Sequence, residues 1–203
     1  MNAAPLASLT LGGYLEALAA KQPVPGGGAA SAVALAHGAA LGSMVLHYTL
    51  GKPKFASWEH DNAAMLLHLD HARTEALALA DLDAQAYAAL NALWRLPKDD
   101  PGRAGFASAV LAAIAAPEAT VVLAHDTVGE LAKLCGTTSP SLASDLRIAL
   151  DLAAAAALAA QENVRINLPS VEDPSLRGAI SARTEAVLAA ATARAGALRA
   201  SLG

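Results

Sequence analysis

The feature that most constrains this chain is a run of 22 residues, Ala29 to Leu50, that contains no Asp, Glu, Lys or Arg. Before it stands Pro23-Val24-Pro25-Gly26-Gly27-Gly28, in which two prolines stiffen the approach and three glycines follow. Small and apolar residues over this length predict a helix. A glycine-rich turn at its start would leave backbone N–H groups free at the positive end of the helix dipole. A polar or anionic ligand can therefore approach the backbone here.

A run of this length is also long enough to cross a bilayer. It is rich in Ala, Gly and Ser rather than Leu, it contains His37 and His47, and no second comparable run is expected. We therefore interpret it as the central helix of a bundle, buried on all sides, in a protein that does not enter a membrane. On this interpretation His37 is a core histidine satisfied by its neighbours, with a role in a site as the alternative.

Composition favours helices packed by close backbone approach. The chain is 55% hydrophobic but only 3% aromatic, so its core must be built from Ala, Leu and Val. Gly38 and Gly42 lie four residues apart, a spacing that lets a second helix come close. With 203 residues, no linker and no repeat, the chain is expected to form a single domain over residues 1–203.

Charge and cysteine content narrow the function classes. The net charge is −4, which argues against a nucleic-acid partner. The lone Cys135 excludes an internal disulfide framework and fits a reducing compartment, so a cytoplasmic location is expected. Residues 1–10 lack the basic start of a secretory signal.

Helical signals run along the whole chain, and neither period-2 alternation nor β-branched clusters compete with them. We predict an all-α, multihelical bundle with long helices, after a loose arm at residues 1–9. Thr10, Ser57 and Asp173 are the expected N-caps, and Gly136 is the expected residue after a helix end. The predicted helices span about 11–21, 29–49, 57–94, 103–116, 117–134, 141–168 and 174–201.

One carboxylate falls within an apolar stripe. In the third predicted helix, Asp83 comes four residues after Leu79 and four before Tyr87. Asp81 points nearly the opposite way, because two residues turn a helix by about 200°. The spacing therefore predicts a buried Asp83 and an exposed Asp81. A carboxylate in an apolar stripe is costly unless it is paired or used.

A second set of polar residues shares one face of the sixth predicted helix. Asp145 and Asn163 are 18 residues apart, which is about 27 Å along the axis, and Asn167 follows one turn later. Within one helix, Asp145 and Asn163 cannot both touch the same small group. They lie at opposite ends of a groove, belong to different sites, or meet across two subunits.

Several motifs in the right order resemble the cyclodeaminase/methenyltetrahydrofolate cyclohydrolase family, which is the C-terminal domain of formiminotransferase-cyclodeaminase and its stand-alone bacterial relatives. The resemblance covers nearly the whole chain and implies an all-α fold, an intertwined homodimer, and action on the one-carbon unit of tetrahydrofolate. It rests on Pro25-Gly26-Gly27-Gly28, Gly38-Ala39-Ala40-Leu41-Gly42-Ser43-Met44-Val45, Thr49-x-Gly51-Lys52-x-Lys54-Phe55, Asp81-x-Asp83-Ala84-x-Ala86-Tyr87, Leu96-Pro97-Lys98, Ser144-Asp145-Leu146 and Asn163-x-x-Ile166-Asn167-Leu168.

This resemblance implies a folate derivative as the ligand, with no cofactor beyond the tetrahydrofolate substrate and no metal. Because a stand-alone domain has no fused formiminotransferase, methenyltetrahydrofolate cyclohydrolase is the first expectation. Formiminotetrahydrofolate cyclodeaminase is the second, and a non-catalytic folate-binding or scaffold dimer is the rival from another class. The expected catalytic residues are Asp83, Asp145 and Lys52, and the expected substrate-binding residues are Pro25, Gly26, Gly27, Gly28, Lys54, Asn163 and Asn167.

Each of these residues also has a structural alternative. Asp83 can pair with a lysine or a helix N-terminus, and Asp145 can favour its own helix N-terminus. The two lysines can belong to a solvated loop, the two asparagines can satisfy a helix end, and the glycines can simply make a tight turn. Three further histidines cluster on one side of the third helix, where a solvated face is expected rather than a metal site: His60, His68 and His71.

Overall fold

A computed structural model of the protein describes residues 4–201, and every regular element in this range is helical. The predicted all-α class is therefore confirmed. Short 3-10 turns, among them η1 (Leu6–Ser8) and η2 (Pro53–Trp58), connect the longer elements. The α-helices are α1 (Leu11–Ala19), α2 (Gly27–His47), α3 (Glu59–Trp94), α4 (Phe106–Lys133), α5 (Ala143–Asn167) and α6 (Pro174–Ser201).

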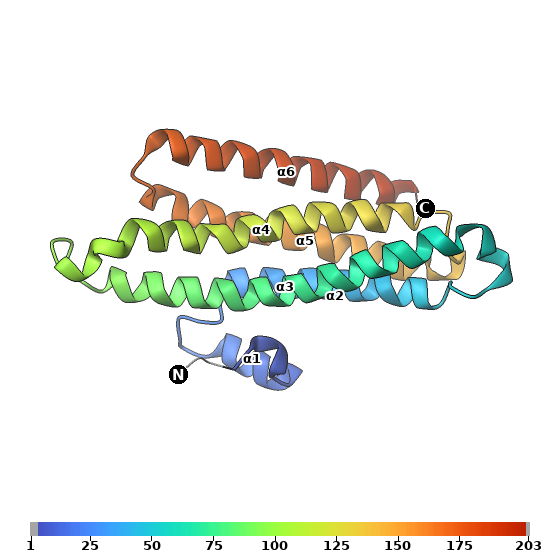
Figure 1. Ribbon diagram of the computed structural model, residues 1–203, viewed down its shortest axis with the longest axis horizontal. Coiled ribbons are helices and arrows are strands. Elements are labelled where there is room, and N and C mark those ends of the chain that lie inside the picture. Colours follow the sequence, from blue (N-terminus) through green and yellow to red (C-terminus); the bar gives the residue numbers. More distant parts are fainter. Residues whose placement is uncertain (1–3, 202–203) are drawn as a thin grey trace.

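Helices α2 to α6 lie side by side as an elongated bundle, while α1 stands outside it on the side of α2 and α3 (Figure 1). Helix α2 packs against α3 and α5, and α4 packs against α3, α5 and α6. The core is aliphatic, as the composition predicted. Its largest fully buried side chains include Leu35, Leu46, Leu69, Leu131 and Leu150.

Two glycines of α2 permit this packing. A Cβ at Gly38 would lie 2.9 Å from the Ala149 carbonyl oxygen of α5. A Cβ at Gly42 would lie 2.5 Å from a methyl carbon of Leu131 on α4. The close approach predicted from their spacing is confirmed, and α2 is held near the centre of the bundle.

Three of the predicted helix-end signals are confirmed. The Gly13 N–H donates to Thr10 Oγ1 at 3.1 Å, and the Ser175 N–H donates to Asp173 Oδ1 at 2.8 Å. Gly136 follows α4 with a φ of +84°. The cap predicted at Ser57 is wrong, because the 3-10 turn that begins at Pro53 runs directly into α3 and leaves Ser57 inside that turn.

The largest error in the predicted helices concerns Pro117, which was expected to start a new helix. Instead it is buried in the middle of the single helix α4. A proline inside a helix removes the N–H that would bond the carbonyl four residues earlier, here Ala113. The Asn167 side chain donates to that carbonyl oxygen at 3.4 Å. A neighbouring helix therefore satisfies the group that Pro117 leaves free.

Helix α2 is not buried on all sides. His37 is exposed, and its Nδ1 lies 2.8 Å from the Val33 carbonyl oxygen of its own helix. The expectation of a core histidine is therefore wrong, because one narrow side of α2 lies outside the contacts with α3, α4 and α5.

Within residues 4–201, two helical segments are long and apolar enough to cross a membrane, by length and composition alone. They are Gly27–His47, whose most apolar stretch is 61% buried within the protein, and Pro101–Lys133, whose most apolar stretch is 39% buried. The expectation of no second comparable run is wrong, because the predicted break at Pro117 divided one apolar helix into two.

Candidate functional site

The glycine-rich turn places α2 directly against an acid. Gly26 is the N-cap of α2 and has no side chain of its own with which to cap this helix end. Gly28 is buried, and a Cβ there would lie 2.1 Å from Asp83 Oδ1. No residue other than glycine can occupy position 28 without displacing this carboxylate. The turn does allow a close approach to its backbone, as predicted. In this structure the group that approaches is the Asp83 side chain of α3.

Asp83 is buried, as the apolar stripe predicted, with 8% of its surface exposed. Burial raises the pKa of its carboxyl group, and a hydrogen bond from the Ala29 backbone N–H opposes this shift without cancelling it. The carboxylate thus faces the positive end of α2, where the helix dipole favours negative charge. The structural alternatives for Asp83 were a lysine partner and a helix N-terminus. Its carboxylate lies at the N-terminus of α2, and no lysine pairs with it among residues 4–201.

Asn163 of α5 joins this group from the opposite side. A Cβ at Gly27 would lie 3.4 Å from Asn163 Oδ1, so Gly27 leaves the space that this side chain uses. The Asn163 amide nitrogen donates to the Ala159 carbonyl oxygen at 3.0 Å. Helices α2, α3 and α5 therefore meet at the N-terminal end of α2, around Gly27, Gly28, Asp83 and Asn163. We call this group the glycine end.

Asn167 lies one turn beyond Asn163 and is almost fully buried, with 4% of its surface exposed. Its side-chain nitrogen donates to the Ala113 carbonyl oxygen and, at 2.9 Å, to the Asn163 carbonyl oxygen. Only Oδ1 has no hydrogen-bond partner among the described residues. A ligand at Asn167 would have to use that single atom.

A cavity of about 600 Å³ is lined by residues adjacent in sequence to the glycine end, while the four residues of the glycine end itself are not part of its lining. Its lining includes Pro25, which directly precedes the glycine turn at Gly26, and Ala84, which directly follows Asp83. Its other wall is the N-terminal arm, through Pro5, Leu6 and Leu9. Its volume lies in the usual range of small-molecule sites, about 300–1,000 Å³.

The N-terminal arm is tied to the bundle by Asp81. The Leu6 N–H donates to Asp81 Oδ1 at 2.8 Å, and Asp81 is half-buried. The prediction of an exposed Asp81 is wrong because residues far away in sequence cover it. The arm is ordered at residues 6–8 as η1, while residues 1–3 of the predicted arm lie outside the described range.

The remaining predicted residues lie at the other end of the bundle. Lys52 and Lys54 are exposed around η2, with the Lys54 ammonium 5.5 Å from the centre of the Phe55 ring. Asp145 is half-buried in the first turn of α5. Lys54 and Phe55 line a separate cavity of about 380 Å³. We call this region the lysine end.

Other ionisable groups form pairs instead of a metal centre. Among residues 4–201, no three His, Cys, Asp or Glu side chains converge where they could hold a metal ion. Two of the clustered histidines each face a carboxylate, His68 at Glu130 and His71 at Glu75, both at 3.3 Å. Cys135 is half-buried, and burial raises the pKa of its thiol.

Residues 10–186 match the sequence profile of the formiminotransferase-cyclodeaminase family. The chain belongs to this family. The formimidoyltransferase-cyclodeaminase of Sus scrofa is 33% identical over 187 residues, which cover 86% of this chain and 33% of that protein. The corresponding protein of Gallus gallus is 27% identical over 177 residues, 85% of this chain and again 33% of that protein. The chain thus spans about a third of the length of these relatives.

Two further family members match this chain over most of their own length. The methenyltetrahydrofolate cyclohydrolase of Methylorubrum extorquens is 29% identical over 169 residues, 81% of each chain. The crystal structure of formiminotetrahydrofolate cyclodeaminase from Thermotoga maritima is similar with a TM-score of 0.86 and 26% identity, over 97% of this chain and 98% of that one. The family resemblance found in the sequence motifs is therefore confirmed.

Proposed function

We propose that this family member is a methenyltetrahydrofolate cyclohydrolase, which converts 5,10-methenyltetrahydrofolate and water to 10-formyltetrahydrofolate. One observation carries the proposal: the buried Asp83 carboxylate is held against Gly28 at the start of α2, and its sequence neighbour Ala84 lines a cavity of about 600 Å³. The methenyl compound is a cationic amidinium, and a carboxylate in a site of low polarity stabilises such a cation.

Asp83 has two tasks in the proposed reaction. It faces the cation in the ground state, and it accepts a proton as water adds to the methenyl carbon. The carbinol hydroxyl then loses its proton as the carbon–nitrogen bond to N5 breaks and N5 takes up a proton, so the formyl group stays on N10 and one proton is released overall. A carboxylate whose pKa is raised by burial is a stronger proton acceptor than an ordinary aspartate.

The other proposed residues hold the substrate or the charge around it. Pro25 and the glycines Gly26 to Gly28 offer backbone against which the folate lies, while Asn163 and the free Oδ1 of Asn167 face the pterin edge. Lys54 binds the glutamate tail, and Lys52 and Asp145 complete the charge around the reacting group. No cofactor beyond the tetrahydrofolate substrate takes part in this proposal.

Formiminotetrahydrofolate cyclodeaminase is the second candidate, favoured by the likeness to the Thermotoga maritima enzyme over nearly the whole of both chains. In that reaction N10 closes onto the formimino carbon and ammonia leaves, so the same cationic methenyl compound is the product. A folate-binding dimer without catalysis is the third candidate.

The absorbance of 5,10-methenyltetrahydrofolate separates these candidates. With purified protein, its decay should exceed the buffer rate and fall on Asp83→Asn. Ammonia release from formiminotetrahydrofolate, measured in parallel, identifies a cyclodeaminase. Decay no faster than in buffer would overturn the cyclohydrolase proposal, and folate binding without either reaction would leave the non-catalytic dimer.

We also propose that the working unit is a homodimer with composite sites. Helix α2 has 21 residues and separates the glycine end from the lysine end by about 30 Å. One folate cannot reach Asp83 and Lys52 of the same chain at the reacting group. An antiparallel arrangement of two copies would bring the lysine end of one to the glycine end of the other.

Mixed dimers test this arrangement. Asp83→Asn and Lys52→Ala are each expected to inactivate their own homodimers. If the sites are composite, re-equilibrating equal amounts of the two restores about a quarter of wild-type activity, because half the dimers are mixed and each carries one intact site. Failure to regain activity, in a mixture shown to exchange subunits, would place each site within one chain.

Two broader proposals complete this picture. We propose that residues 1–203 act as one domain, since the family match extends over residues 10–186 without a break. We also propose a cytoplasmic location, supported by the free thiol of Cys135.

A further inference from the structure

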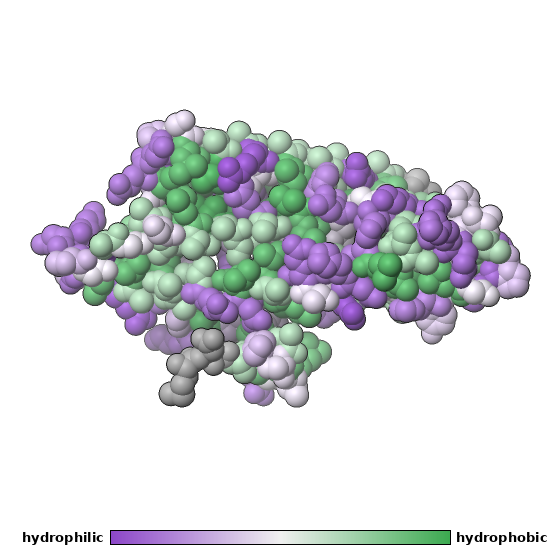
Figure 2. All heavy atoms as spheres, viewed as in Figure 1, coloured by the Kyte–Doolittle hydropathy of each residue, from purple (hydrophilic) through white to green (hydrophobic). Residues whose placement is uncertain are grey.

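A hollow of about 450 Å³ lies on the face made by α3, α4 and α6, and none of the residues proposed for the folate site lines it. Hydrophilic side chains gather over the middle of the α3–α4 side in the space-filling view (Figure 2). Acidic and basic groups both line the hollow. The acids are Glu75, Asp126 and Glu130, and the basic residues are His68, His71, Lys133 and Arg194.

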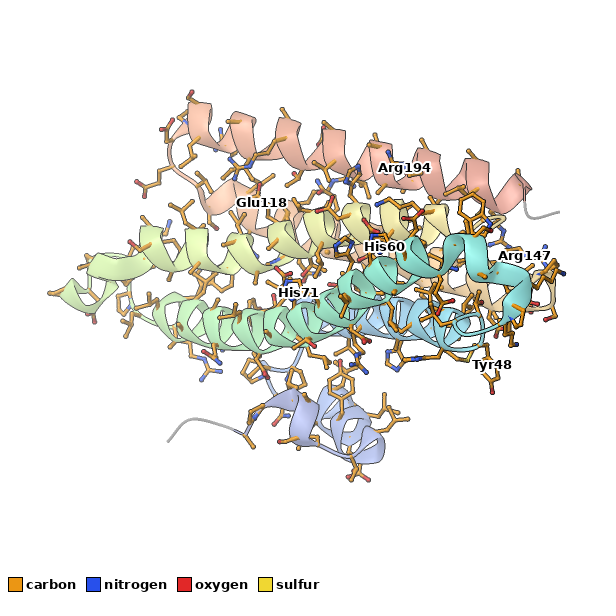
Figure 3. The ribbon with its side chains drawn as sticks, turned by 45° about the vertical axis from the view of Figure 1, so that its right-hand side comes forward. Tyr48, His60, His71, Glu118, Arg147 and Arg194 are labelled. Carbon is orange, nitrogen blue, oxygen red and sulfur yellow. The ribbon has the colours of Figure 1, made fainter. Side chains whose placement is uncertain are left out.

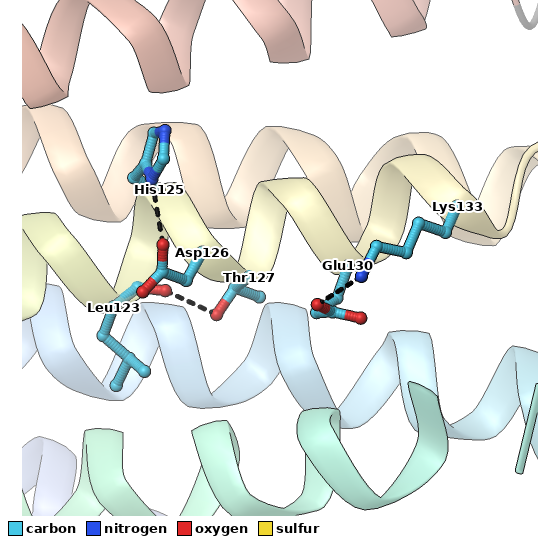
Figure 4. A network of polar contacts seen from close by, with 6 residues as sticks. All are labelled: Leu123, His125, Asp126, Thr127, Glu130 and Lys133. Atoms are coloured by element: carbon cyan, nitrogen blue, oxygen red, sulfur yellow. Dashed lines mark hydrogen bonds and ion pairs between the residues drawn. The ribbon is translucent and has the colours of Figure 1, made fainter. Parts of the chain in front are cut away.

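Glu130 carries an unused hydrogen-bonding atom at this hollow. Its Oε1 accepts a hydrogen bond from Lys133 Nζ at 2.7 Å (Figure 4). Burial is the largest single cause and would raise the pKa of Glu130, but Lys133 and His68 together outweigh it and hold the pKa below its usual value. Its Oε2 is buried and 3.3 Å from His68 Nδ1, without the geometry of a hydrogen bond. One acceptor atom of this wall, Glu130 Oε2, is therefore left without a hydrogen bond in the described part of the chain, although His68 lies near it.

Arg194 is the unmatched cation of the opposite wall. No hydrogen bond or ion pair from its guanidinium occurs within residues 4–201, whereas Arg183 and Arg199 of the same helix pair with Glu118 and Asp151. Figure 3 labels Arg194 on α6 and His71 on α3, on either side of α4. This wall of the hollow therefore lacks an anion.

The two walls are close enough for one small molecule to touch both. A Cβ at Gly129 would lie 2.9 Å from Arg194 Nη1, so the guanidinium rests against the backbone of α4. Asp126 lies three residues before Gly129 and therefore near it on the surface of α4, and Glu130 lines the same hollow as Arg194. Glycine inside a helix costs about 0.5–1 kcal/mol relative to alanine.

We propose that this hollow binds a small zwitterion of the amino-acid class. The ligand carboxylate takes the paired N–H groups of Arg194, and the ligand ammonium faces Glu130 and Asp126. A simple anion would lie beside three carboxylates, and a simple cation would leave Arg194 unmatched. Ala72 and Leu123 provide the apolar part of the lining for the ligand side chain.

Isothermal titration of the full chain with L-leucine tests the proposal, with 4-methylpentanoate and 3-methylbutylamine as its two half-ligands. Leucine should bind at least about tenfold more tightly than either half, because each half loses one charged hydrogen-bonding contact. No heat with leucine, or equal affinity for one half, would overturn the proposal.

Matched arginine variants locate the binding. Arg194→Gln should abolish leucine binding, and Arg199→Gln, on the same helix but outside the hollow, should retain it. Circular dichroism checks that both variants are folded. Unchanged leucine binding in a folded Arg194→Gln protein would overturn the assignment. The folate reaction should be equally fast in both variants, so the failure of this proposal is distinguishable from failure of the proposed function.

Discussion

The glycine end and the lysine end of the bundle carry motifs of the same family in two different physical settings. At the glycine end, Gly28 and Asp83 are buried against each other and support the start of α2. At the lysine end, Lys52 and Lys54 are exposed on a turn. A substitution at the first end must therefore disturb packing as well as chemistry, whereas one at the second end can affect ligand binding alone.

Asp83→Asn should give the largest effect on activity. The amide keeps the size of the side chain but cannot accept a proton or offset a cation, and loss of general acid–base catalysis typically costs about 10²–10⁴-fold. Steady-state kinetics with 5,10-methenyltetrahydrofolate measures it. A fall below twofold would mean that Asp83 only supports the helix, and the two ends would then differ in packing alone.

Gly28→Ala should give the largest loss of stability at the glycine end. Its Cβ would lie 2.1 Å from Asp83 Oδ1, and overpacking of this kind costs about 1–3 kcal/mol. Chemical denaturation measures the free energy of unfolding. Gly178→Ala in α6 is the matched control, since nothing lies within 4 Å of its added Cβ, and it should be neutral or stabilising.

Asn167 and Pro117 should be energetically coupled. Asn167→Ala leaves the Ala113 carbonyl unsatisfied, at a cost of about 1–3 kcal/mol. In a Pro117→Ala background the restored N–H can bond that carbonyl, so the cost of Asn167→Ala should shrink. A double-mutant cycle by denaturation measures the coupling. Equal costs in both backgrounds would contradict this role of Asn167.

The raised pKa of Asp83 predicts a pH dependence of stability. An acid whose pKa is higher in the folded state binds more protons folded than unfolded, so its favourable contribution is present at low pH. That contribution is lost as pH rises from the ordinary aspartate value through the raised one. Asp83→Asn should therefore gain stability relative to wild type over this interval. Parallel pH profiles of the two proteins would refute the shift.

Lys52→Ala and Lys54→Ala should have the smallest effects on stability, within about 0.5 kcal/mol, because both side chains are exposed. The effects should appear in the kinetics instead, as a raised KM for folate derivatives with Lys54→Ala and a loss of kcat with Lys52→Ala. Unfolding curves and kinetics on the same preparations separate the two. A stability loss as large as that of Gly28→Ala would remove the contrast between the ends.

Local pattern was enough where the deciding forces are local. The apolar stripe around Asp83, the caps at Thr10 and Asp173, and the close approach at Gly38 and Gly42 are all confirmed. Errors arose where a distant segment intervened. Asp81 is covered by Leu6, and Pro117 stays within α4.

The sequence by itself determined the helical class, the family and the burial of Asp83, because helix periodicity and motif order are written along the chain. Only the tertiary structure decided which motif residues meet. It brought Gly28, Asp83 and Asn163 together from three helices and left Lys52, Lys54 and Asp145 at the far end. The physical reason is that helices are rigid rods, whose lengths and packing set the distance between groups irrespective of their order in the chain.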